Sequence, residues 1–381
     1  MQNPMLLKNC DLWAPEHLGR RDVFVAGGKI VAVEPELSID FPGLETIDMK
    51  GAKLVPGLID QHIHVTGGGG EGGWQSRCPE LVFSELVRAG VTTFLGVSGT
   101  DSMSRSIENL LAKVRGLAAE GATGFMWTSN YAYPPTTITH DVKTDLFAIP
   151  EVLGVKIALG DHRSSWPTKE ELLRLASEVR IAGMLTGKVG FVHVHLGDHP
   201  TAFDLMEACI ATGIPAKHFR PTHTGRHPEV FRRACEFAKA GGIIDITTGG
   251  GNYLGTAAET LHAALAAGVP AERITLSSDG HGSMPRFNDA GEMVGLAVGL
   301  INCNKETIGE LAKDLGLEAA LRFMTTNVAQ ALNLTEKGAI VPGADADLLV
   351  VDDAFEPQWV FMRGRIAMRD GEILMKGAFE D

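Results

Sequence analysis

The sequence predicts an α/β protein: a (β/α)8 TIM-like barrel with a small β-sandwich domain formed by both chain termini. Short apolar runs alternate with helix-length segments eight times over about 280 residues, which matches the size and rhythm of such a barrel. β-Like runs also lie near both ends of the chain. A doubly wound sheet would show fewer strands and a nucleotide-binding loop after the first, so the barrel is favoured.

The terminal runs are separated by Gly, Pro and Asp turn signals. They occupy residues 5–7, 22–25, 29–33 and 46–48, and then 348–351, 359–362 and 373–375. Strands from both ends can pair in one small domain. We therefore expect residues 1–55 and 336–381 to form the β-sandwich and residues 56–335 to form the barrel.

The middle of the chain offers the barrel strands. They cover residues 54–64, 92–97, 123–129, 155–159, 191–197, 219–224, 243–247 and 274–279. Helix-length stretches between them include residues 79–88, 107–119, 201–211, 229–240 and 256–266. In this fold the functional groups gather at the carboxyl ends of the strands, so the polar residues there form one set.

Composition excludes several classes of protein. The chain has 381 residues, of which 44% are hydrophobic and 21% charged, as in a globular protein of one large and one smaller domain. A net charge of -13 without a basic run argues against nucleic acid as a partner. The sequence has no basic leader and no apolar stretch of membrane-spanning length. Five scattered cysteines fit a reducing compartment, so we expect a cytoplasmic protein that binds no membrane.

The first barrel strand ends with His62 and His64. Residues two apart in a strand face the same side, so the pair can present two imidazoles to one metal ion. An ordinary strand with two polar residues at its exit gives the same motif, and the motif alone does not decide between them.

Other predicted strands carry more residues of the kinds that bind or surround metals. These are Lys156, His193, His195, His223 and Asp279. Imidazoles and carboxylates hold divalent transition metals, and the set exceeds what one ion needs, which favours two ions. Taken singly, His223 also fits a loop histidine and Asp279 a turn residue or helix N-cap.

Lys156 lies in an apolar strand, where an inward-facing ammonium would meet a large desolvation cost beside metal cations. Reaction with carbon dioxide would turn the amine into a carbamate anion, whose two oxygens could bridge two cations. Alternatively, the side chain points outward and reaches water past a helix.

Together these segments resemble the binuclear-zinc amidohydrolases, and most closely the bacterial isoaspartyl (β-aspartyl) dipeptidases. The resemblance extends over nearly the whole chain and implies a homo-oligomer, an octamer in that family. It rests on residues 60–64, 67–71, 99–102, 154–156, 161–164, 195–198, 221–223 with Arg226, and 277–280.

The resemblance implies two Zn2+ ions per chain and hydrolysis of the amide bond of β-aspartyl dipeptides by a hydroxide that bridges the metals. Asp279 would pass the proton of this hydroxide to the leaving amine, and Tyr131 would donate to the oxyanion. His193 matches no family ligand and is expected to be structural. The implied zinc ligands are His62, His64 and Asp279 for one ion, His195 and His223 for the other, and carboxylated Lys156 for both.

A β-aspartyl dipeptide carries one ammonium and two carboxylates. Glu71 would meet the ammonium, and Arg163 and Arg226 would each bind a carboxylate. Without the resemblance, the glycine-rich loop 67–70 also fits a linker or a phosphate cradle, and the arginines fit surface ion pairs. The family implies further substrate contacts from Gly69, Thr100 and Ser283.

Three alternatives remain: hydrolysis of another N-acyl amino acid, hydrolysis or deamination of a cyclic amide, and a metal-free barrel that serves as an assembly protein. Glu71 and the two arginines argue against a ring substrate, and the complete ligand set argues against a metal-free barrel. Trp74, Tyr133 and His281 depart from the family pattern and leave the preferred leaving residue open.

Overall fold

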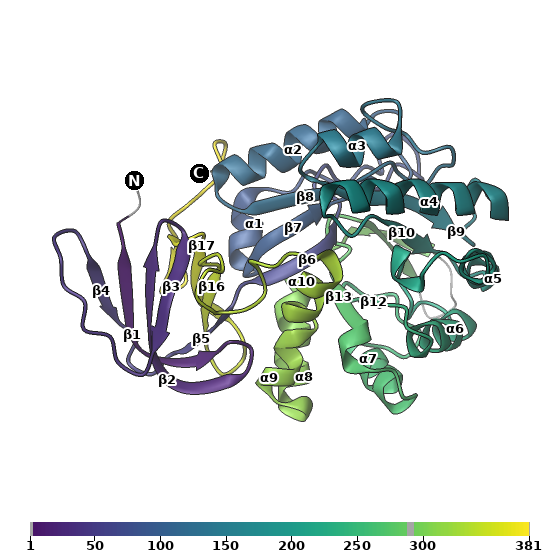
Figure 1. The fold of residues 1–381 in the computed structure, drawn as a ribbon. Helices are drawn as coiled ribbons and strands as arrows, with labels where there is room; N and C mark the ends of the chain where they lie inside the picture. The colour runs from purple at the N-terminus through teal and green to yellow at the C-terminus, as the bar shows by residue number, and fades with distance from the viewer. Residues whose placement is uncertain (1–2, 288–292, 381) are drawn as a thin grey trace.

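The computed structural model describes residues 3–287 and 293–380. Figure 1 shows a β-rich part in which purple strands from the start of the chain lie beside yellow strands from its end, and an α/β part made by the segment between them. The domain bounds expected from the sequence, residues 1–55 with 336–381 and residues 56–335, stay a prediction. None of the helices in the described ranges is both long and apolar enough to cross a bilayer.

Both chain ends contribute to one nine-stranded sheet with the order β19-β18-β17-β16-β5-β1-β2-β3, in which β4 also pairs with β1. The link between the two ends is the antiparallel pair of β5 and β16, where Leu54 lies opposite Val350. One β unit from both termini is therefore present, and its sandwich form stays a prediction. The strands are β1 (Met5–Trp13), β2 (His17–Ala26), β3 (Lys29–Glu34), β4 (Glu45–Asp48), β5 (Lys53–Pro56), β16 (Leu348–Val351), β17 (Pro357–Met362), β18 (Arg365–Arg369) and β19 (Glu372–Ile373).

The predicted barrel strands appear as a six-stranded parallel sheet and a parallel pair. A bridge between Ile63 and Gly280 joins the first strand to the last, and Thr224 N donates to Asp245 O over 3.3 Å between the sheet and the pair. These contacts close the ring. Its strands are β6 (Leu58–Ile63), β7 (Val91–Gly96), β8 (Thr123–Thr128), β9 (Val152–Leu159), β10 (Phe191–Leu196), β11 (Phe219–Thr222), β12 (Ile244–Thr247) and β13 (Ile274–Ser277).

Helices cover the outside of this ring (Figure 1). The long helix α4 begins at a capping box, because Thr168 accepts from the backbone of Glu171 and the Glu171 side chain accepts from that of Thr168. A hairpin, β14 (Ser283–Phe287) and β15 (Met293–Val298), follows β13. The helices are α1 (Phe83–Arg88), α2 (Ile107–Glu120), α3 (Val142–Ala148), α4 (Lys169–Thr186), α5 (Thr201–Ala211), α6 (Pro228–Lys239), α7 (Ala257–Ala266), α8 (Cys303–Leu315), α9 (Leu317–Arg322) and α10 (Thr326–Leu332).

Apolar side chains from several strands of the ring pack together against α10. Ile59, Trp127 and Phe191 form a buried cluster with Val328 and Leu332 of α10, which covers the amino-terminal end. His62 on β6 and His195 on β10 follow further along two of these strands. The fold therefore leaves the carboxyl end as the face where a substrate can reach polar groups.

The pairing of the two chain ends generates a stability prediction. Leu54 is fully buried in the terminal sheet, so Leu54→Ala is expected to destabilise the protein by about 2 to 5 kcal/mol, through lost apolar burial and the cavity left behind. Chemical denaturation measures the difference. Leu185→Ala on the exposed face of α4 is the matched control and should change stability by less than about 0.5 kcal/mol. Equal effects of both substitutions would contradict this account of the sheet.

Candidate active site

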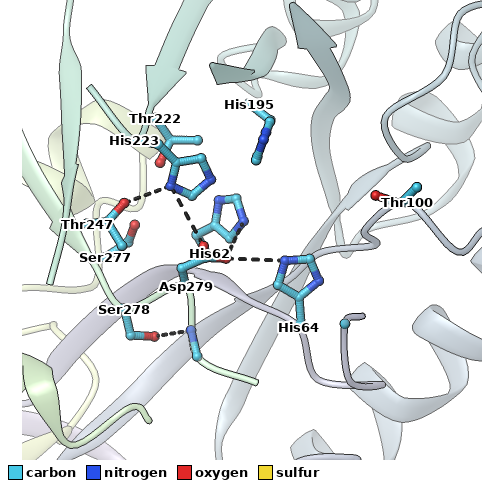
Figure 2. Close-up of polar contacts among 12 residues, drawn as sticks. His62, His64, Thr100, His195, Thr222, His223, Thr247, Ser277, Ser278 and Asp279 are labelled. Carbon is cyan, nitrogen blue, oxygen red and sulfur yellow. Dashed lines mark hydrogen bonds and ion pairs between the residues drawn. The ribbon is translucent and has the colours of Figure 1, made fainter. Parts of the chain in front are cut away.

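A buried carboxylate at the carboxyl end of the barrel lies beside two predicted metal ligands, His62 and His64 (Figure 2), and beside Arg226. Asp279 Oδ1 lies 3.4 Å from His62 Nε2 and 3.3 Å from His64 Nε2. Asp279 Oδ2 accepts from Arg226 Nη2 over 2.8 Å. The end of β6 reaches the loop after β13 because these strands are neighbours in the closed ring, as the backbone bond from His64 N to Gly280 O also shows.

His223 follows β11 and joins the same group. Its Nδ1 lies 2.7 Å from Thr247 Oγ1 and 3.9 Å from Asp279 Oδ2. Its ring centroid is 5.0 Å from that of His62. One ligand atom from each of His62, His223 and Asp279 can be chosen so that all lie within 4.8 Å of one another, a spacing that could hold a metal ion.

Lys156 on β9 is fully buried and points into the ring, so the outward orientation left open by the sequence is wrong. Its Nζ lies 3.2 Å from His62 Nε2 and 5.2 Å from the ring centroid of Tyr131. Burial lowers the pKa of Lys156 to about 7. Within residues 3–287 and 293–380, no carboxylate forms an ion pair with this amine.

Burial also keeps the site imidazoles neutral. Desolvation lowers the pKa of His62, His64 and His223, and it lowers that of His195 to about 3. Neutral imidazole is the form that binds a metal. Two buried nitrogens, His64 Nδ1 and His223 Nε2, have no hydrogen-bond partner among the described residues, which fits a set of metal ligands.

Asp279 remains ionised although it is buried. Burial by itself would raise its pKa, but His223, His64, His62 and Arg226 together hold that pKa well below the ordinary value. An anionic carboxylate beside neutral imidazoles and an unpaired amine is a donor set suited to transition-metal cations.

His195 on β10 has protein groups at both of its ring nitrogens, whereas His64 and His223 each have one nitrogen without a partner among the described residues. Tyr131 Oη lies 2.9 Å from Nδ1, and Asp161 Oδ2 lies 3.1 Å from Nε2. Arg163 Nη2 is 3.3 Å from the same Nε2. Metal binding by His195 therefore requires one of these contacts to be exchanged. Its ring still lies near the others, 4.6 Å from that of His223.

His193, the histidine predicted to be structural, contacts the site residue His62. Its Nε2 lies 2.8 Å from His62 Nδ1, and its ring stacks on Trp127 with 5.2 Å between centroids. His193 lies opposite Lys156 in the paired strands β9 and β10. It fixes the orientation of His62 rather than extending the cluster.

Three acids of the site were missed in the sequence. Asp161 binds the Arg163 guanidinium through Nε and Nη2, each over 2.8 Å, and its place two residues before Arg163 is the signal that could have identified it. Asp60 accepts from His62 N over 3.1 Å. Asp245 accepts from Gln61 Nε2 over 2.6 Å, and burial raises its pKa to about 6.

The predicted substrate contacts lie on loops around this cluster. Glu71 Oε1 accepts from Arg163 Nη1 over 2.9 Å and from Thr100 Oγ1 over 3.0 Å. Gly69 has φ +84, and a Cβ there would lie 2.3 Å from Ser76 O, so the turn requires glycine. Ser283 opens β14, shortly after Asp279.

The three positions that depart from the family pattern, Trp74, Tyr133 and His281, lie in different surroundings. Trp74 is 84% exposed in the loop after β6. His281 is buried and turned to Pro79 O, 2.9 Å from its Nδ1, and to Glu85 Oε1, 3.3 Å from its Nε2. Tyr133 is partly buried, and its backbone N donates to Ser165 Oγ. His281 therefore supports the loop before α1, whereas Trp74 is available at the rim.

Two cavities border the site. One of about 420 Å³ is lined by Arg163 and Arg226 together with the acids Asp161 and Asp198. The other, of about 480 Å³, is lined by Glu71 and Thr100 together with the apolar side chains of Trp74 and Met103. The buried cluster thus lies between a rim that carries two arginines and a rim that carries Glu71, Asp101 and an apolar surface.

Comparison with known proteins places residues 54–369 in the amidohydrolase family. The chain is also similar to a solved β-aspartyl dipeptidase from Fervidobacterium islandicum AW-1 in complex with the β-Asp-Leu dipeptide, with 40% identity and a TM-score of 0.90. That match covers 97% of this chain and 98% of the other. A further structure of the β-aspartyl dipeptidase from that organism gives 38% identity, a TM-score of 0.90 and coverage of 99% and 100%.

Curated relatives are more distant. Adenine deaminase 1 from Latilactobacillus sakei is 25% identical over 376 residues, a match that covers 92% of this chain and 55% of the deaminase. The chain thus spans about half the length of the first curated relatives it matches.

The imidazole cluster predicts metal binding that depends on His62. His62→Asn should lower the metal bound per chain, because the ring faces Asp279, Lys156 and His193 at the centre of the cluster. Elemental analysis of the purified variant, with circular dichroism to check the fold, measures the effect. His262→Asn on α7 is the control and should retain the full metal content. Unchanged metal in His62→Asn would refute the assignment.

Proposed function

The chain belongs to the amidohydrolase family, and we propose that it is a metal-dependent hydrolase of β-aspartyl dipeptides. The observation that carries the proposal is the 40% identity over nearly the full length of a β-aspartyl dipeptidase whose structure contains β-Asp-Leu. The charges around the site support it. Glu71 faces one cavity and Arg163 and Arg226 the other, which suits a substrate with one ammonium and two carboxylates.

We further propose that the site holds two zinc ions, with carboxylated Lys156 as the bridge. Buried neutral imidazoles, two of them with a nitrogen that lacks a partner, and a buried amine without an acid support this donor set. When bound, the zinc ions would activate water and polarise the amide carbonyl. The residues that would hold them are His62, His64, His195, His223, Lys156 and Asp279.

We propose that Asp279 carries the proton in hydrolysis. It is ionised, it lies beside His62 and His64, and Arg226 holds one of its oxygens in place. A carboxylate in this position can take a proton from attacking water and return it to the leaving amine, which departs as a neutral group.

We propose that Tyr131 donates a hydrogen bond to the developing oxyanion. Burial raises its pKa, so the phenol remains protonated and able to donate. Its hydroxyl, now 2.9 Å from His195 Nδ1, would turn to the substrate when His195 exchanges this contact.

The rim residues divide the recognition of the substrate. Asp161 fixes Arg163 through two of its nitrogens and leaves Nη1, now paired with Glu71, to turn to a carboxylate. Glu71, released from that pair, can meet the ammonium of the aspartyl group, with Thr100 holding its carboxylate. Arg226 binds the other carboxylate beside Asp279.

The resemblance to the family also supports proposals on the domains, the location, the assembly and two further substrate contacts. We propose that residues 1–55 and 336–381 form a β-sandwich domain and residues 56–335 the barrel domain, that the enzyme acts in the cytoplasm, and that it assembles as a homo-oligomer. Gly69 and Ser283 are proposed as further substrate contacts.

The proposed activity predicts release of leucine from β-Asp-Leu by the zinc-loaded protein. The α-linked dipeptide Asp-Leu, which presents its carboxylate and ammonium at different places, should be a poor substrate, and adenine should not be deaminated. Chromatographic detection of the products measures all three reactions. Turnover of adenine without turnover of β-Asp-Leu would exclude the dipeptidase function.

The proposed role of Glu71 predicts a loss of activity that depends on the ammonium group of the substrate. Glu71→Gln should lower kcat/KM for β-Asp-Leu by about ten- to a hundredfold, since a hydrogen bond between charged groups is lost. The same peptide with an acetylated amine should be cleaved equally poorly by both proteins. Glu178→Gln on α4 serves as the control. An equal loss for both peptides would show that Glu71 does not bind the ammonium.

A further inference from the structure

A third cavity lies at the amino-terminal end of the barrel, away from the histidine cluster. It has a volume of about 740 Å³, within the range of about 300 to 1,000 Å³ typical of small-molecule sites. Its charged lining is strongly basic although the chain as a whole carries a net charge of -13. The charged side chains are Arg180, Lys188, Lys217, Arg220 and Arg273, with Glu272 as the one acid among the lining residues.

Arg220 is the unusual member of this lining. It lies on β11, is 5% exposed, and its guanidinium packs over the Phe191 ring with Cζ 4.9 Å from the centroid. Nη2 donates to Ala331 O of α10 over 2.8 Å. Nε and Nη1 are buried and have no partner among the described residues. A buried guanidinium with most of its donors unused is costly unless an anion completes it.

No acid of the described chain balances this charge. No ion pair joins Arg220 to a carboxylate of residues 3–287 or 293–380, and Glu272 is exposed. Burial and the nearby Arg273 lower the pKa of Arg220 to about 9, which is the direction expected for a cation without a counterion.

The surrounding basic groups are held in place by backbone oxygens. Lys188 Nζ donates to the carbonyls of Leu146, Ile149 and Val152. Arg273 Nη1 donates to Gly241 O over 3.0 Å. One nitrogen of Arg273 is thus anchored while its other donors remain for a ligand. Lys217 is exposed at the mouth.

We propose that this cavity is a binding site for a phosphate group, with Arg220 as its buried anchor and Arg273 as its second cation. A guanidinium fork matches two oxygens of a phosphate, and a dianion balances two arginines. The phosphate is either the free ion or part of a small phosphate monoester, because both present the same oxygens. The site is separate from the hydrolytic centre and does not rest on the proposed dipeptidase function.

Isothermal titration calorimetry in chloride buffer tests the proposal with inorganic phosphate and with glycerol phosphate. The full-length, metal-loaded protein should bind at least one of them, and Arg220→Met should weaken this binding at least about tenfold by removing the charge-assisted hydrogen bonds. Tighter binding of glycerol phosphate would identify a monoester as the ligand, and tighter binding of inorganic phosphate would identify the free ion. Arg232→Gln, on the exposed face of α6, is the control and should bind as the wild type does.

Thermal unfolding gives an independent readout. Without phosphate, Arg220→Met should unfold at the same temperature as the wild type or a higher one, because an uncompensated buried charge is replaced by an apolar side chain of similar length. Added phosphate should raise the unfolding temperature of the wild type but not of the variant. If Arg220→Met does not fold, Arg273→Gln tests the same loss of binding.

Two results would overturn the proposal. The first is no binding of either compound by the wild type at millimolar concentrations. The second is binding that persists unchanged in Arg220→Met and in Arg273→Gln, which would place the phosphate elsewhere, for example on the metals of the histidine cluster.

Discussion

The structure depends on closure of the barrel, because only closure brings the ends of β6 and β13 together. The bridge between Ile63 and Gly280 flanks the point where Asp279 faces His62 and His64. In an open sheet the first and last strands would lie at opposite edges, and this carboxylate would have neither imidazole nearby. The apolar packing of the strands and the polar cluster above it are therefore consequences of one topology.

Period-two alternation explains what could be predicted from the sequence. It places His62 and His64 on one face, and eight repeated units place the polar residues at one end of a ring. Burial could not be predicted this way: the inward orientation of Lys156 was open until the strand order placed it opposite His193. The bond between Gln61 and Asp245 spans 184 residues of sequence, so no local pattern signals it.

The buried charges at the two ends of the barrel differ in the partners that surround them. At the carboxyl end, Asp279 has imidazoles and Arg226 around it, and its ionised form is stabilised. At the amino-terminal end, Arg220 lies against Phe191 with a single backbone oxygen as its described partner. The difference follows from chain geometry. The loops after the strands bring acids such as Asp161 and Asp279 to one end, whereas at the other end α10 contributes the apolar side chains of Val328 and Leu332 and no acid.

The site has a rigid part, whose imidazoles contact side chains on the barrel strands, and an adaptable rim formed by loops. His62 is held by His193, which stacks on Trp127, and His223 is held by Thr247, so these rings sit on strands and the residues directly after them. Glu71 and Arg163 instead come from loops and bind each other. An arriving ammonium and carboxylate can exchange that pair without moving a strand. If the proposed dipeptidase function holds, a substitution at this rim, for example of Trp74, would change which leaving residue fits and leave the buried cluster unchanged.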